Sequence, residues 1–142
     1  MPLDGQRGDS AALAQLTPSA ARQAYVAVIT SAVTPARRPR TRLGLGWLPH
    51  GGGYKSIKAD STFLTPVAAS TGLKGVCVVG RLACYQHRQA VLMLSQLYQV
   101  GPDALRVFAH WESGSYGLEE VFLLRQVNGR WAVAARRTVM VT

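Results

Sequence analysis

Residues 118–127 (LEEVFLLRQV) and 130–141 (RWAVAARRTVMV) are two long apolar and β-branched runs, separated by Asn128 and Gly129 alone. An Asn-Gly pair between such runs favours a type I′ hairpin turn, because this turn requires positive φ at both central residues. The sequence therefore predicts a long antiparallel hairpin. Its register decides which side chains share a face of the sheet.

The turn places Val127 opposite Arg130, and counting back along the hairpin places Phe122 opposite Ala135. One face of the hairpin is then mostly apolar. Its members are Leu118, Phe122, Leu124, Trp131, Val133, Ala135, Val139 and Val141. The same face carries Glu120 opposite Arg137, and a charge on a core face is costly unless it is paired. Two interpretations stay open, a structural ion pair and a pair that lines a wet pocket.

Two earlier apolar runs, 90–100 and 105–112, are followed by turn residues and extend the hairpin to a four-stranded antiparallel meander. A helix is predicted over 19–33, with Thr17 as N-cap and Pro18 at its first position. The predicted fold is α+β, with this N-terminal helix packed on a curved four-stranded antiparallel sheet. Residues 1–16 are predicted to be a flexible lead-in to a single domain, 17–142.

The middle of the chain gives weaker signals. Residues 54–64 predict a short strand, Thr65-Pro66 predicts the start of a second helix, and 72–89 fits either a helix or a hairpin. A hairpin turn at Gly80-Arg81 would place Cys77 opposite Cys84, close enough for a disulfide. Two free thiols are the alternative.

The chain of 142 residues is 48% apolar and has a formal net charge of +9. No run of 18 apolar residues and no signal peptide is visible, so we expect no membrane span. The basic residues cluster once, as Arg37, Arg38, Arg40 and Arg42, which makes this stretch the candidate polyanion site. Aromatic residues are not interleaved with the cluster, so we do not expect nucleic acid to be the main partner. Cysteine and histidine spacings predict no metal site, and no motif predicts a cofactor.

His110 is the one histidine in the predicted sheet. Strand alternation turns it away from the core face, towards Glu119 or Arg136. If the turn at 113–115 shifts the parity, His110 instead meets Glu120 and Arg137. A histidine paired with a carboxylate can serve as a general base, although most strand histidines are bystanders.

The order of elements, ending in LLRQVNGRWAVAARR, resembles the nuclear transport factor 2-like superfamily. Many small bacterial members end in a strand, an Asn-Gly turn, an Arg/Lys-Trp pair and a final strand, as residues 127–133 do here. The resemblance implies a curved-sheet cone with an apolar pocket. Such domains act as enzymes, ligand binders or dimerisation modules, so the fold does not decide the function. In the enzyme members a carboxylate base and a Tyr or acid donor lie in the pocket, and the corresponding candidates are Glu120 and Tyr25.

We therefore expect a non-catalytic domain that binds a small apolar ligand or a protein partner through the concave face. The expected ligand-binding residues are Tyr25, Trp111, Glu120, Phe122 and Arg137. One alternative is an isomerase, cyclase or hydrolase-type enzyme with Glu120 or His110 as general base, and another is a polyanion-binding protein. The outer sheet face predicts a homodimer, with Glu119 and Arg136 near its rim. Its apolar residues are Val121, Leu123, Ala132, Ala134 and Met140.

Overall fold

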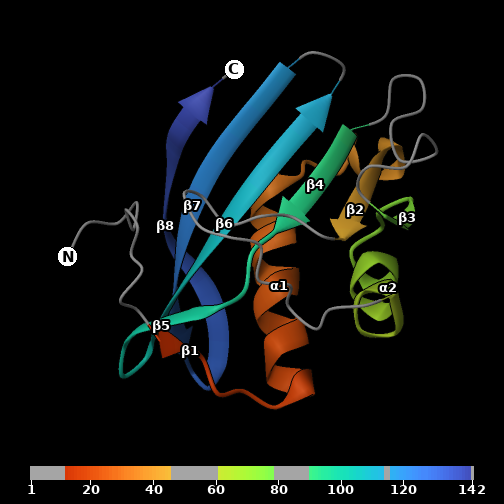
Figure 1. Ribbon diagram of the computed structural model, residues 1–142. Helices are drawn as coiled ribbons and strands as arrows, with labels where there is room; N and C mark the ends of the chain where they lie inside the picture. Colours follow the sequence, from red (N-terminus) through yellow and green to blue (C-terminus); the bar gives the residue numbers. More distant parts are fainter. Residues whose placement is uncertain (1–11, 46–60, 79–89, 114–115, 142) are drawn as a thin grey trace.

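The computed structural model describes residues 12–45, 61–78, 90–113 and 116–141. They form an α+β fold, in which a mixed eight-stranded sheet carries one long helix across a face (Figure 1). The helices are α1 (Pro18–Ala32), the 3-10 helix η1 (Arg38–Arg40) and α2 (Ser61–Ser70). The strands are β1 (Ala12–Leu13), β2 (Thr41–Leu45), β3 (Gly75–Val78), β4 (Ala90–Leu94), β5 (Tyr98–Gly101), β6 (Ala104–Ser113), β7 (Tyr116–Val127) and β8 (Arg130–Val141).

The long strands run β8-β7-β6-β4-β2-β3 across the sheet, and β5 lies beside β6 with β1 next to it. Strands β4 to β8 pair antiparallel, which confirms the predicted meander. The sheet is larger than the four strands that we expected, because β2 pairs parallel with both β3 and β4. β1 falls within the predicted lead-in and pairs with β5.

The run 90–100 is two strands rather than one. β4 and β5 pair with different parts of β6, and Ser95 lies at the break between them. The backbone N–H of Ser95 donates to the Phe108 carbonyl at 2.9 Å, and the Ser95 hydroxyl accepts from the Phe108 N–H at 2.8 Å. The serine hydroxyl thus completes the ladder where the strand bends, since a buried backbone N–H requires a partner.

Helix α1 begins as its sequence predicts. The Thr17 side chain accepts a hydrogen bond from the Ala20 N–H at 3.1 Å, and Pro18 occupies the first helical position. Its buried residues recur at helical spacing and face the sheet. They are Ala24, Tyr25, Val28, Ile29 and Ala32.

The second helix starts earlier than predicted. α2 begins at Ser61, so Pro66 lies inside the helix and not at its start. The predicted strand over 54–64 is therefore wrong for residues 61–64, and residues 54–60 lie outside the described residues. β3 forms the first part of the ambiguous segment 72–89, which excludes a helix there. The predicted turn at Gly80-Arg81 lies outside the described residues.

The C-terminal hairpin has the predicted turn, with φ of 54° at Asn128 and 78° at Gly129. Its pairing follows the predicted register from Val127↔Arg130 up to Leu124↔Val133. There a β-bulge adds one residue to β8, and the next pair is Leu123↔Ala135.

The bulge moves the pairs from Leu123 to Glu120 by one residue, and a second irregularity between Glu120 and Glu119 moves the last two pairs by one more. Phe122 faces Arg136 and Glu120 faces Thr138, so the predicted pairs of Phe122 with Ala135 and of Glu120 with Arg137 are wrong. Because side chains alternate along a strand, the extra residue also exchanges the two arginines between the faces. Arg136 points to the helix side of the sheet, and Arg137 points away from it.

The main core fills the space between α1, α2 and the sheet. Its largest fully buried side chains are Tyr25, Phe122, Ile29, Leu43, Leu92, Leu105 and Leu124. A second, small cluster on the other face consists of Cys77, Val91 and Met93. β6 is buried on both faces from Ala104 to Ala109, so the sheet is covered on both sides in this region.

Candidate functional site

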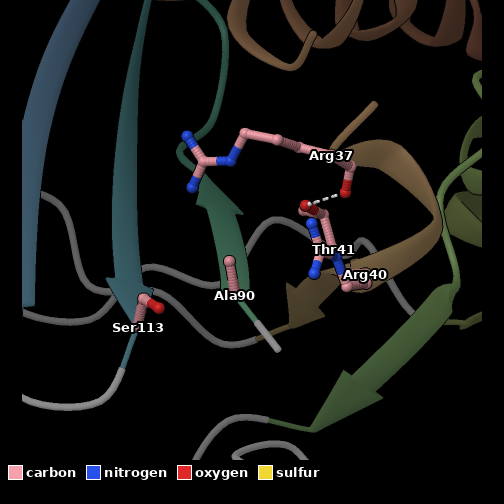
Figure 2. Close-up of a pocket in the computed structure, with 5 residues that line it drawn as sticks. All are labelled: Arg37, Arg40, Thr41, Ala90 and Ser113. Atoms are coloured by element: carbon pink, nitrogen blue, oxygen red, sulfur yellow. Dashed lines mark hydrogen bonds between the residues drawn. The ribbon is translucent and has the colours of Figure 1, made fainter. Parts of the chain in front are cut away.

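A cavity of about 210 Å³ lies at one end of β2, β4 and β6 (Figure 2). It is lined by Arg37, Arg40, Thr41, Ala90 and Ser113. Thr41 and Ala90 are neighbours in the parallel pair of β2 and β4, and Ser113 is the last residue of β6. The two arginines come from the connection between α1 and β2.

This connection is a tight turn that holds the arginines in place. The Arg37 N–H donates to the Thr34 carbonyl at 2.9 Å, and the Arg40 N–H donates to the Arg37 carbonyl at 3.0 Å. The Thr41 hydroxyl also donates to the Arg37 carbonyl, at 2.9 Å (Figure 2). Three successive hydrogen bonds therefore fix the backbone at one wall of the cavity.

The four clustered arginines have different roles. Arg38 bonds the end of α1, since its Nε donates to the Val33 carbonyl at 3.0 Å and its guanidinium also reaches the Thr30 carbonyl. A cationic side chain at a helix C-terminus can donate hydrogen bonds to the free carbonyls, and its charge interacts favourably with the negative end of the helix dipole. Arg42 lies within β2, opposite Gly75 and Val91. Arg37 and Arg40 are left to line the cavity.

The Arg37 side chain extends from its turn towards β4 and β6 (Figure 2). Its guanidinium lies over the Trp111 ring, 5.2 Å from the ring centre. This cation–π contact restricts a long side chain that is otherwise exposed. No carboxylate of the described residues pairs with Arg37 or Arg40. The described wall of the cavity therefore carries two positive charges and two hydroxyl groups.

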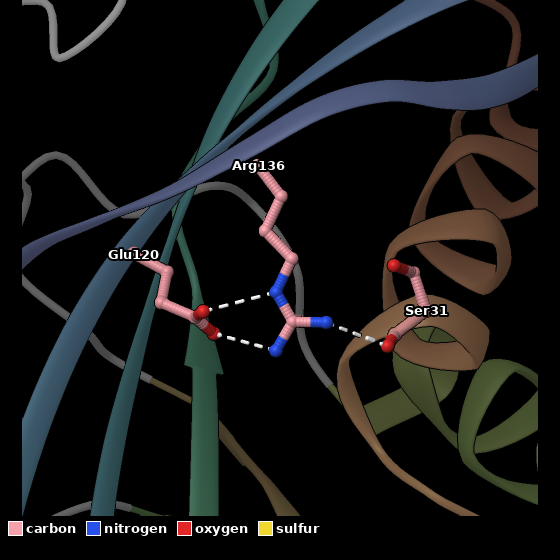
Figure 3. Close-up of polar contacts among 3 residues, drawn as sticks. All are labelled: Ser31, Glu120 and Arg136. Carbon is pink, nitrogen blue, oxygen red and sulfur yellow. Dashed lines mark hydrogen bonds and ion pairs between the residues drawn. The ribbon is translucent and has the colours of Figure 1, made fainter.

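Glu120 is bound by an arginine and buried. Its carboxylate accepts from Arg136 Nε at 3.0 Å and from a second guanidinium nitrogen at 3.3 Å (Figure 3). Arg136 also donates to the Ser31 carbonyl at 2.8 Å and lies over the Phe122 ring, so it joins β7 to the end of α1. The Glu120 side chain is 6% exposed. These contacts fit the structural interpretation of the predicted ion pair, with Arg136 in place of Arg137.

His110 lies on the sheet face away from α1, opposite Glu119 in the β6–β7 pair. Its Nε2 is 3.3 Å from a Glu112 carboxylate oxygen. The first of the two predicted placements, near Glu119, is confirmed. The polar triad of His110 with Glu120 and Arg137 is not formed, because Glu120 is on the helix side.

The other predicted ligand residues are dispersed. Tyr25 is buried in the core and its hydroxyl donates to the Ser95 carbonyl at 2.8 Å. Burial raises the pKa of this phenol far above its usual range, and nearby Tyr98 adds to the rise. Phe122 is fully buried, Arg137 is exposed, and Trp111 alone touches an arginine of the cavity.

The sequence predicts binding roles for Arg37, Arg40 and Trp111, but not for Thr41, Ala90 and Ser113. These three meet only because β2 runs parallel to β4 and β4 runs antiparallel to β6. A hydroxyl residue beside a predicted turn was the one available signal, at Thr41 and at Ser113. Strand pairing between distant segments has no local signature in the sequence.

The predicted dimer surface is partly buried within a single chain. Val121 is 0% exposed and Glu119 is 4% exposed, whereas Ala132, Ala134 and Arg125 are exposed. Arg136 belongs to the opposite face, since it binds Glu120 and Ser31.

Cys77 takes part in a disulfide, which contradicts the alternative of two free thiols. Cys84, the only other cysteine of the chain, lies outside the described residues. In the parts of the chain that the structure describes, no three His, Cys, Asp or Glu side chains are grouped to hold a metal ion. Within those same parts, neither helix has the length and apolar character needed to cross a membrane.

Comparisons with known proteins give no relative for this chain. No protein-family model matches it, and no curated protein or solved structure matches it either. The site must therefore be interpreted from its own geometry.

Proposed function

We propose that this domain is non-catalytic and binds a small molecule through an anionic group, in the cavity that Arg37, Arg40 and Ser113 line. The observation that carries the proposal is the pair of arginines without a described acidic partner at one cavity. Guanidinium groups suit carboxylate and phosphate oxygens, because their planar donors bind two oxygens at once. The Ser113 hydroxyl can add a further donor.

The volume of the cavity fits a small ligand. Pockets for drug-sized ligands have roughly 300–1,000 Å³, and this cavity has about 210 Å³. The Thr41 hydroxyl already donates to the Arg37 carbonyl, so towards a ligand it can act as an acceptor. A ligand with an oxyanion beside a hydroxyl or amino group would use both kinds of partner.

The same contacts favour a single anionic group over a polyanion. Electrostatic affinity for a polyanion grows with the number of phosphates contacted. Of the four clustered arginines, Arg38 is bonded to the end of α1 and Arg42 is set into the sheet. Two arginines remain at the cavity, too few for a strong polyanion site.

The resemblance to the nuclear transport factor 2-like superfamily remains part of the proposal. A helix packed on antiparallel strands supports it, whereas the parallel pairs of β2 depart from the expected four-stranded cone. The expected apolar ligand on the concave face receives less support, because Tyr25 and Phe122 are packed in the core. The enzyme alternative also receives little, since Glu120 is held by Arg136 and His110 is on the other face.

A titration tests the proposed function. Phosphate and acetate are added separately at low salt to isotope-labelled protein, and the amide signals of Thr41 and Ser113 are followed by NMR. Arg37→Gln and Arg40→Gln should each weaken binding about tenfold, the loss expected for one charge-assisted contact. Arg125→Gln removes an exposed arginine of β7 and serves as the matched control. Unmoved amide signals with both anions, or an equal loss in the control, would contradict the proposal.

Self-association is a separate proposal. The exposed part of the outer face, around Ala132 and Ala134, would form the contact of a two-fold dimer. Light scattering at micromolar concentration tests it, and a mass of 15.3 kDa would show a monomer.

A further inference from the structure

The strand side of the cavity is one row of residues across three strands. Thr41 and Ala90 are paired in β2 and β4, and the register of Val91↔Glu112 places Ser113 of β6 opposite Ala90. Neighbouring strands lie about 4.8 Å apart, so the two hydroxyl residues are at the ends of a row about 10 Å long. Only the small Ala90 side chain lies between them (Figure 2).

The two arginines add positive charge to this row. Arg37 and Arg40 both line the cavity, and both are exposed. The ion pairs formed by carboxylates of the described residues lie elsewhere, between Glu120 and Arg136 and between Glu112 and His110. A guanidinium keeps its charge throughout the physiological pH range. The described wall therefore offers two full positive charges to a ligand.

The contact with Trp111 positions Arg37 without using its hydrogen-bond donors. The guanidinium is 5.2 Å from the centre of the ring, and Trp111 itself is 5% exposed, so the ring is fixed in the core. An indole has no acceptor atom, whereas a guanidinium has five N–H donors. These donors remain for a ligand in the cavity.

The donors and charges match a phosphate group better than a carboxylate. Three side chains can donate, namely those of Arg37, Arg40 and Ser113. A phosphate monoester has three terminal oxygens, and above its second pKa of about 6 it approaches two negative charges. A carboxylate has two oxygens and one charge. The Thr41 hydroxyl, which donates to the Arg37 carbonyl, remains as an acceptor for a hydroxyl group of the ligand.

We propose that the cavity recognises the dianion of a phosphate group, with Arg37, Arg40 and Ser113 each donating to its terminal oxygens. This inference rests on the proposed function, because it names the class of anion that the same cavity binds. The shared chemistry is that of a phosphate monoester and of inorganic phosphate, and the experiment separates the two.

The test compares methyl phosphate with dimethyl phosphate, which stays a monoanion at both pH values used. The amide signals of Thr41 and Ser113 are followed by NMR at constant low ionic strength. At pH 7.5 methyl phosphate should bind about tenfold more tightly or better, as expected for one added charge-assisted contact. At pH 5 this preference should fall to about twofold, because only about a tenth of the methyl phosphate is then a dianion. Dimethyl phosphate reports any titration of the protein itself.

Three substitutions separate charge from hydrogen bonding. Arg37→Gln and Arg40→Gln should each weaken methyl phosphate binding about tenfold and reduce the preference over dimethyl phosphate to about threefold or less. Ser113→Ala should weaken methyl phosphate binding about fivefold and keep its dependence on pH, since no charge is removed. Arg125→Gln removes an exposed arginine of β7 and should change neither quantity. Circular dichroism checks that each variant is folded.

Two further ligands identify the source of the phosphate group. Tighter binding of glycerol 3-phosphate than of inorganic phosphate would assign the site to an organic monoester, whose hydroxyl groups can donate to Thr41. The reverse order would assign it to the free ion.

Equal affinity for methyl and dimethyl phosphate at pH 7.5 would overturn the inference and leave the binding of a single anionic group intact. Tighter binding of malonate, which carries two charges on two carboxylates, would also overturn it, because each arginine would then bind its own carboxylate. Absence of binding by every anion, acetate included, would contradict the proposed function as well.

Discussion

Gln23 and Trp131 form a two-way pair, in which the side-chain amide of one exchanges hydrogen bonds with the backbone N–H and C=O of the other. This contact ties α1 to β8 at the point where the edge of the sheet meets the helix. Together with Arg136, which bonds Ser31 at the other end of α1, it fixes the helix along the strand.

Replacing Gln23 with Leu should lower the free energy of unfolding by about 1–3 kcal/mol, because two partly buried backbone groups of Trp131 lose their partners. Urea unfolding measures the change. Gln126→Leu makes the same replacement at an exposed residue of β7 and should change stability by less than about 0.5 kcal/mol. Equal losses in both variants would mean that the Gln23 contact adds no stability.

Replacing Arg136 with Met should destabilise the protein by about 2–4 kcal/mol, since Glu120 would remain buried without its counter-charge. Changing Glu120 to Gln together with Arg136→Met should recover part of the loss, because the neutral amide is cheaper to bury. A double-mutant cycle by thermal or urea unfolding gives the coupling. The matched variant Arg125→Met removes an exposed arginine of β7 and should have a small effect, and an equal loss in both variants would mean that the buried pair adds no stability of its own.

The stability of the protein should fall above pH 10 in part because of Tyr25. Its pKa in the folded protein is raised by burial, whereas the unfolded chain ionises near the usual value of about 10. The contribution of Tyr25 to the free energy of unfolding is therefore complete below that pH. As the pH rises further, the unfolded chain releases the phenol proton while the folded protein keeps it, so this contribution is lost. Tyr25→Phe should show a flatter decline between pH 9 and 11, to be measured by urea unfolding. An identical decline in both proteins would contradict this assignment.

Replacing Gly129 with Ala should cost about 1–2 kcal/mol, because its φ of 78° is strained for a residue with a Cβ atom. No atom lies within 4 Å of the added Cβ, so the cost comes from the backbone alone. Gly101→Ala is a suitable control, since its φ is not in the left-handed region and its Cβ would meet Ala104 at 3.4 Å. Thermal unfolding should show a larger loss of stability for Gly129→Ala than for Gly101→Ala.

Local signals predicted the local elements. Thr17 and Pro18 defined the start of α1, and Asn128-Gly129 defined the turn and the register next to it. The bulge in β8 could not be predicted, because the slip exchanges Arg136 for Arg137 and the two residues are identical. An arginine therefore lies near Glu120 in either register, although Ala135 and Thr138 change faces.

The candidate site could be predicted only in part, for a similar reason. The arginine cluster was visible, but its division into a helix-capping Arg38 and a cavity-lining pair depends on a turn of a few residues. Thr41 and Ser113 join the site through pairing between β2, β4 and β6. The paired strands lie far apart in the chain, and a short apolar run does not indicate which other strand it pairs with.

The pairing of Gln23 with Trp131 also has a consequence for the order of folding. The two residues are 108 positions apart, whereas Val127 and Arg130 close a two-residue turn. Small loops close faster than large ones. For a distant contact, the chain loses loop-closure entropy before the contact contributes any stabilising free energy. The C-terminal hairpin should therefore form early, and α1 should dock on β8 late. A contact made after the transition state slows unfolding and leaves the folding rate unchanged. Gln23, which bonds the backbone of Trp131 in β8, should therefore act mainly on the unfolding rate of the domain. The Asn-Gly turn should act mainly on its folding rate.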